Sequence, residues 1–476
     1  MNKYYLTSAI PYVNAAPHIG HAQEFVYADV IRRFQKIQKK DVYYLCGADE
    51  NGLKIIRAAE EKGIDPLKFT DSNGRKFLDL AEKLQVEFNV WQRGSNPKHH
   101  LSSQLLWKKC AANGDIYKKN YSGLYCIGCE TFYASEELDE NGECFEHPGR
   151  KLEKVTEENY FFRLSKYQDF LTELITSDKL KITPDFRKKE TLSFIKQGLD
   201  DFSISRSRAR AKNWGVEVPG DPKQIIYVWF DALNIYQSGI GFGYDEKTYN
   251  KYWPANLHVI GKGILRFHAV YWPAILKSAG LSLPGALFIH GYLTVEGQKM
   301  SKTVGNVVDP MEIIKNYSSD SVRYYLLREI PSYNDGDYSE RRFKEVYNAD
   351  LANGLGNLIA RVAKLCEKNK FAFKAKVSKD AGIYPEAAGF ILEYRFNEAL
   401  RIIWEKISEI DKHINQETPW KLQGNALDQA LKYYVKEIIT IACNLQPFLP
   451  QTSEKILEQF TAAAITSEKS LFPRIT

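Results

Sequence analysis

Two histidines, His18 and His21, stand near the start of the chain in the tetrapeptide HIGH at residues 18–21. Residues 3–10 before them are rich in β-forming types, and residues 18–39 carry apolar side chains near helical spacing. The tetrapeptide is therefore expected between a strand and a helix, where free N–H groups and the helix dipole attract phosphate. Imidazoles at that place can donate hydrogen bonds to phosphate oxygens. The plainer alternative is two ordinary histidines near a helix start.

Two lysines, Lys299 and Lys302, stand three residues apart in the segment KMSKT at 299–303. Gly297 and Gly305 flank the segment, as is typical of a loop. Ammonium groups in such a loop can neutralise the charge that develops on a phosphate leaving group. Removing one well-placed donor of this kind typically costs about 100- to 1000-fold in rate. The alternative is a solvated basic turn with no chemical role.

Three of the seven cysteines form a cluster with one histidine: Cys126 and Cys129 are followed, after fourteen intervening residues, by Cys144 and then by His147. Three thiolates and one imidazole at these spacings are typical of a closed, tetrahedral, structural Zn²⁺ site. Buried free cysteines are the alternative. An odd number of unevenly placed cysteines also favours one metal site with free core thiols over a disulfide framework.

An α/β sheet is expected to position the phosphate-facing segments. The strand–helix–strand order over residues 3–46 predicts a right-handed parallel unit. Three later strand-like runs occupy residues 225–230, 257–261 and 286–295, and a helical run at 264–276 lies between the last two. Residues 115–220 have short segments and many charges, which predicts an insertion that splits the α/β domain in the sequence.

The last third of the chain has almost no strand signal after residue 320. Helical periodicity covers residues 341–369, 389–414, 426–446 and 451–460. Prolines at 385, 419, 447 and 450 separate these segments, as proline does at helix boundaries. A C-terminal helical bundle is therefore expected.

The composition excludes several classes of protein. With 476 residues, 44% of them hydrophobic and 26% charged, the chain is neither disordered nor collagen-like, and it has no membrane-spanning body. The first residues lack the pattern of a signal peptide, so a cytoplasmic protein is expected. A net charge of +6 permits an anionic partner and does not demand one.

HIGH near the N-terminus, together with KMSKT after the second half of a split α/β domain, resembles the paired motifs of class I aminoacyl-tRNA synthetases. Within that class the chain is most similar to the methionyl-tRNA synthetase family, essentially from residue 3 to 476. The segments that carry the resemblance include SAIPYVN, GADENG, YVWFDALNIY, HVIGKGILRFH and HGYLTVEGQKMSKT. The resemblance implies a Rossmann-like, parallel-sheet catalytic domain split by an insertion with a single zinc knuckle, followed by an all-α anticodon-binding bundle.

The resemblance also implies an activity. A methionine–tRNA ligase activates L-methionine with ATP and Mg²⁺, and then transfers the methionyl group to the 3′ end of initiator and elongator tRNA(Met). The implied catalytic residues are His18, His21, Lys299 and Lys302. ATP binding adds Gly20, Lys262 and Ser301. The residue implied to bind the ammonium group of methionine is Asp49. The other implied methionine-binding residues are Ile10, Tyr12, Trp229, Ala232, Tyr236, Ile264, His268 and Trp272.

On the bundle, the resemblance places Asn357, Arg361 and Trp420 against the anticodon, where Trp420 would stack on a base. An ordinary surface arginine and a half-buried tryptophan are the alternative. The chain departs from the family at two places. Leu233 and Asn234 stand where some members have proline and a different residue, and Gly263 stands where an aspartate is common.

Five segments are expected: residues 1–114 and 223–290 as the two halves of the catalytic domain, 115–222 as the insertion, 291–345 as the KMSKT loop and stem-contact junction, and 346–476 as the anticodon-binding bundle. No further domain is visible after the bundle, which favours a monomer. Two alternatives stay open. One is a synthetase for another apolar amino acid, although those usually carry a larger insertion. The other is a non-catalytic tRNA-binding relative.

Overall fold

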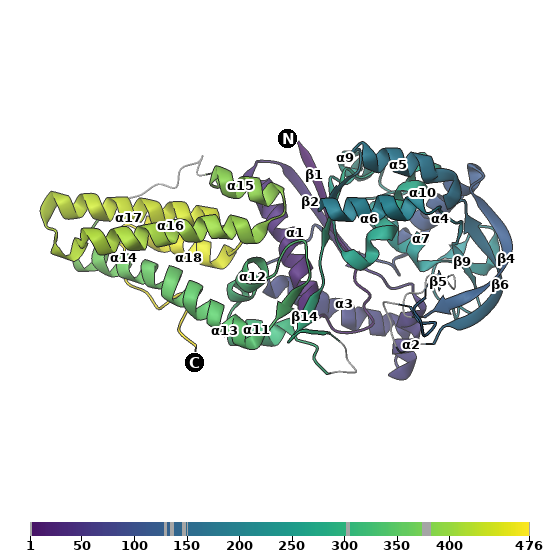
Figure 1. Ribbon diagram of the computed structural model, residues 1–476, viewed down its shortest axis with the longest axis horizontal. Coiled ribbons are helices and arrows are strands. Elements are labelled where there is room, and N and C mark those ends of the chain that lie inside the picture. Colours follow the sequence, from purple (N-terminus) through teal and green to yellow (C-terminus); the bar gives the residue numbers. More distant parts are fainter. Residues whose placement is uncertain are drawn as a thin grey trace. The chain divides into compact units, whose positions relative to one another are not determined.

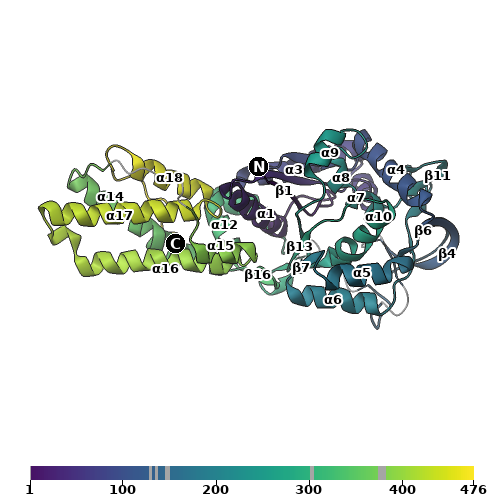
Figure 2. The same cartoon turned by 90° about the horizontal axis from the view of Figure 1, so that it is seen from above.

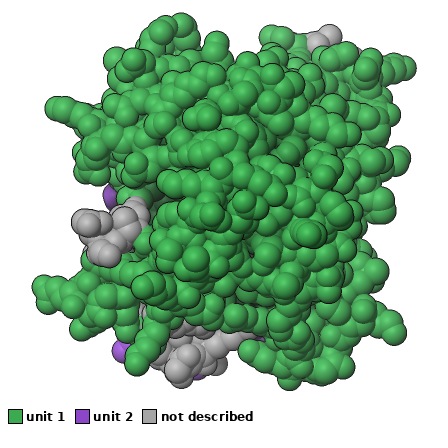
Figure 3. Space-filling model, turned by 90° about the vertical axis from the view of Figure 1, so that its right-hand side faces the viewer, with its two compact units in different colours: residues 1–16, 41–79, 88–289 green, residues 17–40, 80–87, 290–476 purple. Residues whose placement is uncertain are grey.

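The computed structural model describes residues 2–127, 131–133, 138–144, 149, 151–300, 305–373 and 382–475. The chain divides into two compact units, which are coloured green and purple in Figure 3. Unit 1 comprises residues 1–16, 41–79 and 88–289, and unit 2 comprises residues 17–40, 80–87 and 290–476. In the described part of the chain, no helix is both long and apolar enough to cross a membrane.

The core of unit 1 is a six-stranded sheet (Figure 1). Its strand order is β3 (Val90–Arg93), β2 (Asp41–Ala48), β1 (Lys3–Ser8), β12 (Leu257–Gly261), β13 (Ala286–His290) and β7 (Lys181–Thr183). β1 pairs in parallel with β2 and with β12, β2 with β3, and β13 with β7. The parallel α/β sheet expected from the sequence is therefore confirmed, and β12 has the bounds that were expected.

Two expected strands of this region were wrong in part. Residues 225–230 are buried, but β11 (Asp221–Ile226) ends within them and helix α7 (Val228–Leu233) follows. A short, fully apolar run does not distinguish a buried strand from a buried helix. The run at 286–295 is divided into β13 and β14 (Leu293–Val295), which belong to different sheets. The chain needs Gly291 there, because a Cβ on it would lie 2.2 Å from the backbone of Asn334.

Two antiparallel sheets follow within residues 116–226: one has the order β5-β4-β6-β8 and the smaller one has the order β10-β11-β9. Its strands β4 (Ile116–Cys126) and β6 (Glu153–Phe162) pair along their whole length, from Ile116 opposite Phe162 to Tyr125 opposite Glu153. The other elements here are β5 (Thr131–Tyr133), α5 (Gln168–Thr176), α6 (Asp185–Lys196), β8 (Phe202–Ser203), β9 (Ser205–Ser207) and β10 (Glu217–Val218). β7 of the same stretch joins the central sheet.

Unit 1 contains further helices that connect its strands. They are α2 (Leu53–Glu61), α4 (Pro97–Ala112), α8 (Ile235–Ser238), α9 (Glu246–Tyr252) and α10 (Trp272–Ser278). Helix α3 (Pro66–Lys83) begins in unit 1. At the expected helical run 264–276, a 3₁₀ turn at Lys262–Ile264 comes first, followed by a π-helical turn at Phe267–Tyr271 and then by α10.

Unit 2 is mostly helical. Its elements are α1 (Ile19–Ile37), α11 (Pro310–Asn316), α12 (Ser319–Arg328), α13 (Glu340–Val346), a π-helical segment (Tyr347–Gly356), α14 (Asn357–Lys368), α15 (Pro385–Leu392), α16 (Phe396–Glu417), α17 (Gly424–Leu445) and α18 (Pro450–Thr461). Helices α14, α16, α17 and α18 run side by side in Figures 1 and 2. The expected C-terminal bundle is thereby confirmed.

The single helix expected at 389–414 is instead two. Tyr394 has a left-handed backbone with φ of 60°, and the Arg395 N–H donates to Phe390 O at 2.8 Å, which closes α15 before α16 begins. A small sheet of order β15 (Gln298–Lys299), β14 and β16 (Gly336–Tyr338) completes the unit. β16 was not expected, because almost no strand signal is found after residue 320.

Candidate active site

The HIGH tetrapeptide forms the beginning of α1 in unit 2. His18 is the N-cap residue, and its Nδ1 accepts the Gly20 N–H at 3.1 Å. The His18 N–H donates in turn to Nδ1 of His21, also at 3.1 Å, and the two rings lie 3.9 Å apart. Since each Nδ1 accepts a backbone N–H, each neutral ring carries its proton on Nε2. Both imidazoles are thus hydrogen-bond donors at a helix N-terminus.

Burial and the neighbouring His18 hold the pKa of His21 well below its usual value of 6.5. His21 is therefore neutral at physiological pH and can bind an anion through its Nε2–H. Gly20 leaves little room for a side chain, because a Cβ on it would lie 3.0 Å from the His18 ring.

The segment around KMSKT reaches the same end of α1. Lys299 is the last residue of β15, and a Cβ on Gly20 would lie 3.6 Å from Cε of Met300. Further along the chain, the carbonyl of Val308 accepts the N–H of Ile19 at 3.1 Å. Two motifs about 280 residues apart in the sequence are therefore adjacent within unit 2. Ser301 and Lys302 lie outside the described residues.

In unit 1, three aromatic side chains form an apolar box with two isoleucines. Trp229 of α7 stacks on Phe267, with ring centroids 3.7 Å apart and planes 7° apart, and Tyr12 lies edge-on to Trp229 at 6.4 Å. Ile10 and Ile264 pack against the same cluster, which includes the buried Ala232. Sequence reasoning missed Phe267, since only the fold brings it onto Trp229.

A buried Tyr–His pair adjoins this box. Nδ1 of His268 lies 2.9 Å from the carbonyl of Ile264, which can only accept, so Nδ1 carries the proton. Nε2 then accepts the hydroxyl of Tyr236 at 2.8 Å. Burial lowers the pKa of His268 to about 4, so the ring is neutral at pH 7. Trp272 is fully buried, and its ring lies edge-on to Trp253 at 6.2 Å.

Asp49 follows the carboxyl end of β2, where open α/β sheets bind their ligands. The residue is 3% exposed, its N–H donates to Pro11 O at 3.0 Å, and it forms an isolated β-bridge with Tyr12. Lys54 Nζ lies 4.4 Å from the centre of the Tyr12 ring. A carboxylate and one wall of the aromatic box are therefore held together by backbone pairing.

Helix α7 also carries a residue of a buried polar network that was not expected from the sequence. Asp231 of α7 accepts hydrogen bonds from Asn51 at 2.6 Å and Ser103 at 2.7 Å, and His99 Nε2 lies 2.8 Å from it. Burial alone would raise the pKa of Asp231, but His99 and Asn51 hold it below its usual range. The carboxylate thus stays charged and ties α7 to the loop that carries Asp49.

The two departures from the family have different surroundings. The buried amide of Asn234 donates to Ser102 Oγ at 2.9 Å and to Ser103 Oγ at 3.2 Å, so this residue extends the Asp231 network. Gly263 is exposed in the 3₁₀ turn at Lys262–Ile264. Lys262, expected at the nucleotide, is partly exposed in the same turn.

Of the four expected zinc ligands, two are described. Cys126 at the end of β4 and Cys144 are both buried, and their sulfur atoms lie 3.2 Å apart. Cys129 and His147 lie outside the described residues. Among the residues that are described, no group of three or more histidine, cysteine or acidic side chains is arranged as a metal site.

On the bundle, two of the expected anticodon residues, Arg361 and Trp420, lie close together. Asn357 opens α14 and is exposed, and Arg361 lies one turn later. The guanidinium carbon of Arg361 is 5.8 Å from the centre of the Trp420 ring, which is 50% exposed. Asp411 and Asn415 of α16 orient Arg361, each through a contact of 2.6 Å.

Known proteins match this chain over nearly its full length. The family model described as tRNA synthetases class I (M) matches residues 4–363. A methionine–tRNA ligase of Brucella melitensis is 41% identical, over 97% of this chain and 92% of its own, and one of Thermotoga maritima is 40% identical, over 98% and 77%.

A solved structure agrees with these relatives. Mycobacterium tuberculosis methionyl-tRNA synthetase in complex with methionyl-adenylate superposes with a TM-score of 0.90 at 37% identity, and the match covers 100% of this chain and 99% of that one. The matching motifs, the parallel sheet and the near-complete coverage lead to one assignment. The chain belongs to the methionyl-tRNA synthetase family of class I tRNA synthetases.

Proposed function

We propose that this chain activates L-methionine with ATP to methionyl-adenylate and pyrophosphate, and then transfers the methionyl group to the 3′ end of tRNA(Met). The observation that carries the proposal is the aromatic box of Trp229, Phe267 and Tyr12 with the buried Asp49 paired to Tyr12. Aromatic rings make favourable contacts with a thioether sulfur, at about 0.3–1.5 kcal/mol each. Asp49 supplies the anion that the substrate ammonium requires.

The first step needs no protein nucleophile. The carboxylate of methionine attacks the α-phosphorus of ATP, the bond to the β-phosphate oxygen breaks, and pyrophosphate leaves. His18 and His21 donate Nε2–H groups to phosphate oxygens, and Lys299 and Lys302 neutralise the charge of the leaving group. Gly20, Ser301 and Lys262 are assigned to the nucleotide, and Mg²⁺ enters with ATP as part of the substrate. Catalysis is then mainly positioning and charge stabilisation.

In the second step, a hydroxyl of the terminal ribose of tRNA attacks the carbonyl carbon of the adenylate, and AMP leaves. The methionine side chain stays between Ile10, Ala232, Ile264 and the aromatic box during both steps. Tyr236 and His268 form the end of the pocket, with Trp272 behind them. Since His268 is neutral, this end of the pocket carries no charge that would favour a polar side chain over a thioether.

We also assign a structural Zn²⁺ to Cys126, Cys129, Cys144 and His147. The two described thiols fit this assignment, because they are buried and 3.2 Å apart, and soft sulfur donors suit Zn²⁺. The ion would hold the end of β4 and contribute folding energy, with no part in the chemistry. We also propose that the protein is a cytoplasmic monomer and that it charges both initiator and elongator tRNA(Met).

Methionine-dependent exchange of pyrophosphate into ATP is the experiment that tests the activity. Exchange is expected with methionine and not with leucine, isoleucine or valine. Exchange that depends on one of the branched amino acids would favour the first alternative. A wild-type chain that binds tRNA and shows no exchange with any amino acid would be a non-catalytic relative.

The anticodon assignment predicts the effect of Trp420→Ala. Stacking of one base on an aromatic side chain is worth about 1–3 kcal/mol. Charging of tRNA(Met) should therefore fall about 5- to 150-fold, while methionine-dependent exchange stays near the wild-type rate. Tyr433→Ala, which removes another exposed aromatic ring of the bundle, is the matched control and should leave both rates unchanged. Equal losses in charging and exchange would contradict the assignment of Trp420 to the anticodon.

A further inference from the structure

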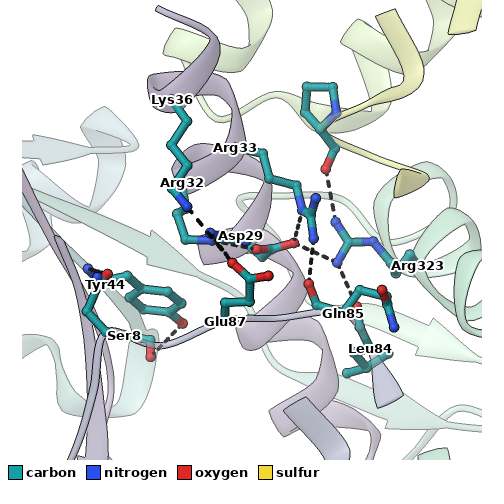
Figure 4. A network of polar contacts seen from close by, with 12 residues as sticks. Ser8, Asp29, Arg32, Arg33, Lys36, Tyr44, Leu84, Gln85, Glu87 and Arg323 are labelled. Atoms are coloured by element: carbon teal, nitrogen blue, oxygen red, sulfur yellow. Dashed lines mark hydrogen bonds and ion pairs between the residues drawn. The ribbon is translucent and has the colours of Figure 1, made fainter. Parts of the chain in front are cut away.

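A buried ion pair joins α1 to the rest of unit 2. Asp29, in the middle of α1, and Arg323 of α12 are both fully buried, and Arg323 Nη1 lies 2.8 Å from Asp29 Oδ2. Figure 4 shows Arg323 pointing toward Asp29, with a dashed line that joins the two side chains. None of the roles assigned to the reaction uses either residue.

Arg323 also holds the turn between α17 and α18. Its Nε donates to Phe448 O at 2.7 Å, and its Nη2 donates to Pro447 O at 2.9 Å. Nη1 makes a further bond to Leu84 O at 2.9 Å. The planar guanidinium of Arg323 thus donates four hydrogen bonds to three separate parts of the chain. A lysine has a single side-chain nitrogen and cannot reproduce this set of bonds.

A second contact of α12 reaches the same place. The carboxylate of Asp320 accepts the backbone N–H of Thr452, in the first turn of α18, at 2.6 Å. Asp320 is 2% exposed, so water does not compete for this bond. α12 therefore contacts the α17–α18 turn through Arg323 and the first turn of α18 through Asp320.

On the other side, Asp29 is surrounded by guanidinium groups. Nε of Arg32 lies 2.8 Å and Nε of Arg33 lies 2.7 Å from its two oxygens. Arg32 also bonds Glu87 at 3.0 Å, and Arg33 bonds Gln85 O at 2.6 Å. Burial alone would raise the pKa of Asp29, but the charges of Arg323, Arg33 and Arg32 lower it, so the carboxylate stays ionised.

Stability is a weak explanation for such a pair. Replacing a buried ion pair with apolar residues of similar volume is often neutral or stabilising, because desolvation offsets the attraction between the charges. A multidentate pair does fix geometry, since its hydrogen bonds are satisfied in one arrangement only. Here the hydrogen bonds fix the position of α1, whose N-cap is His18, relative to the turn after α17.

We propose that Asp29 and Arg323 are positioning residues that hold the anticodon-binding bundle in a fixed relation to α1. The inference rests on the proposed function, in which tRNA is held by its anticodon on this bundle while its 3′ end must reach the adenylate. A looser joint between the bundle and α1 would let the anticodon bind but would deliver the 3′ end less accurately. Misplacement by about 1 Å can cost about 100-fold in rate.

The test uses two RNA substrates on the same enzyme preparations. One is full-length tRNA(Met), and the other is a minihelix with the acceptor stem and no anticodon. The variants are Arg323→Lys, which keeps the charge and loses the fork, and the double variant Asp29→Leu/Arg323→Met, which removes both charges of the pair while Arg32 keeps its bond to Glu87 and Arg33 its bond to Gln85 O. Arg342→Lys, at an exposed pair with Glu329, is the matched control.

For both test variants, kcat/KM for charging full-length tRNA should fall about 10- to 100-fold, while minihelix charging and pyrophosphate exchange stay within about twofold of wild type. The control should change none of the three. Since all rates are measured on one preparation, partial unfolding lowers them together and cannot produce the expected split.

Equal losses on both RNAs, or no loss on full-length tRNA, would overturn the positioning role. Those results are distinct from failure of the proposed function, which would appear as absent methionine-dependent exchange in the wild-type chain.

Discussion

Replacing His21 with alanine is expected to slow methionine activation by about 100- to 1000-fold, which is the usual cost of removing one preorganised donor from a developing phosphate charge. The loss should appear in kcat of pyrophosphate exchange. The KM for methionine should change little, because His21 is assigned to the phosphates of ATP and not to methionine.

The geometry at the start of α1 makes this expectation specific. Nδ1 of His21 accepts the His18 N–H, and the lowered pKa keeps the ring neutral, so the donor is a neutral Nε2–H. Glutamine at this position retains an N–H donor on a side chain of similar reach, so His21→Gln should recover part of the rate that alanine loses. His413→Ala changes a half-exposed histidine of α16 and should have no effect on exchange.

The assignment of His21 as a phosphate donor fails if both His21→Ala and His21→Gln lower the exchange rate by the same small factor, below about threefold. It also fails if the methionine KM rises while kcat is unchanged. Circular dichroism of each variant, measured beside the rate, separates lost chemistry from frayed helix, because the histidine pair also caps α1.

Replacing Asp49 with asparagine is the second change with a large expected effect. Truncating one partner of a buried, hydrogen-bonded charge pair costs about 2–5 kcal/mol. The KM for methionine should therefore rise at least about 30-fold, while the KM for ATP stays near the wild-type value. Asparagine has nearly the same shape, so the β-bridge between Asp49 and Tyr12 should persist.

A substrate analogue gives this prediction a direct control. Methionine without its amino group lacks the charge that Asp49 is proposed to bind, so wild type and Asp49→Asn should bind the analogue equally weakly. Glu61→Gln, at an exposed carboxylate at the end of α2, is the matched control for loss of one charge in unit 1. An unchanged methionine KM in Asp49→Asn would remove Asp49 from the ammonium site.

The parts of the fold that local sequence determined were predicted well. β12 was expected with its observed bounds as a strand-like run, and all five of its residues are buried. The strand expected at 225–230 became the end of β11 and the start of α7, since both states bury the same side chains. The break before α16 depends on the left-handed backbone of Tyr394, a residue type that gives no warning of it.

The candidate site was likewise predicted only in part. The spacing in HIGH placed two imidazoles at a helix start, and the structure adds the reciprocal backbone bonds that set their tautomers. The stack of Phe267 on Trp229 could not be predicted, because it joins two segments that meet only through the sheet. The same holds for Asp231, whose partners Asn51 and His99 come from separate loops and helices.

The order of strands in the central sheet has a consequence for how the protein is made. β1 pairs with β2 on one side and with β12 on the other, where Leu6 lies opposite Leu257. At translation rates of about 5–20 residues per second, β12 leaves the ribosome roughly 10 to 50 seconds after β1. Throughout that interval one edge of β1 offers unpaired N–H and C=O groups to any passing strand. The earliest moment at which the methionine pocket can exist is thus set by the ribosome rather than by the strength of the contacts that line it.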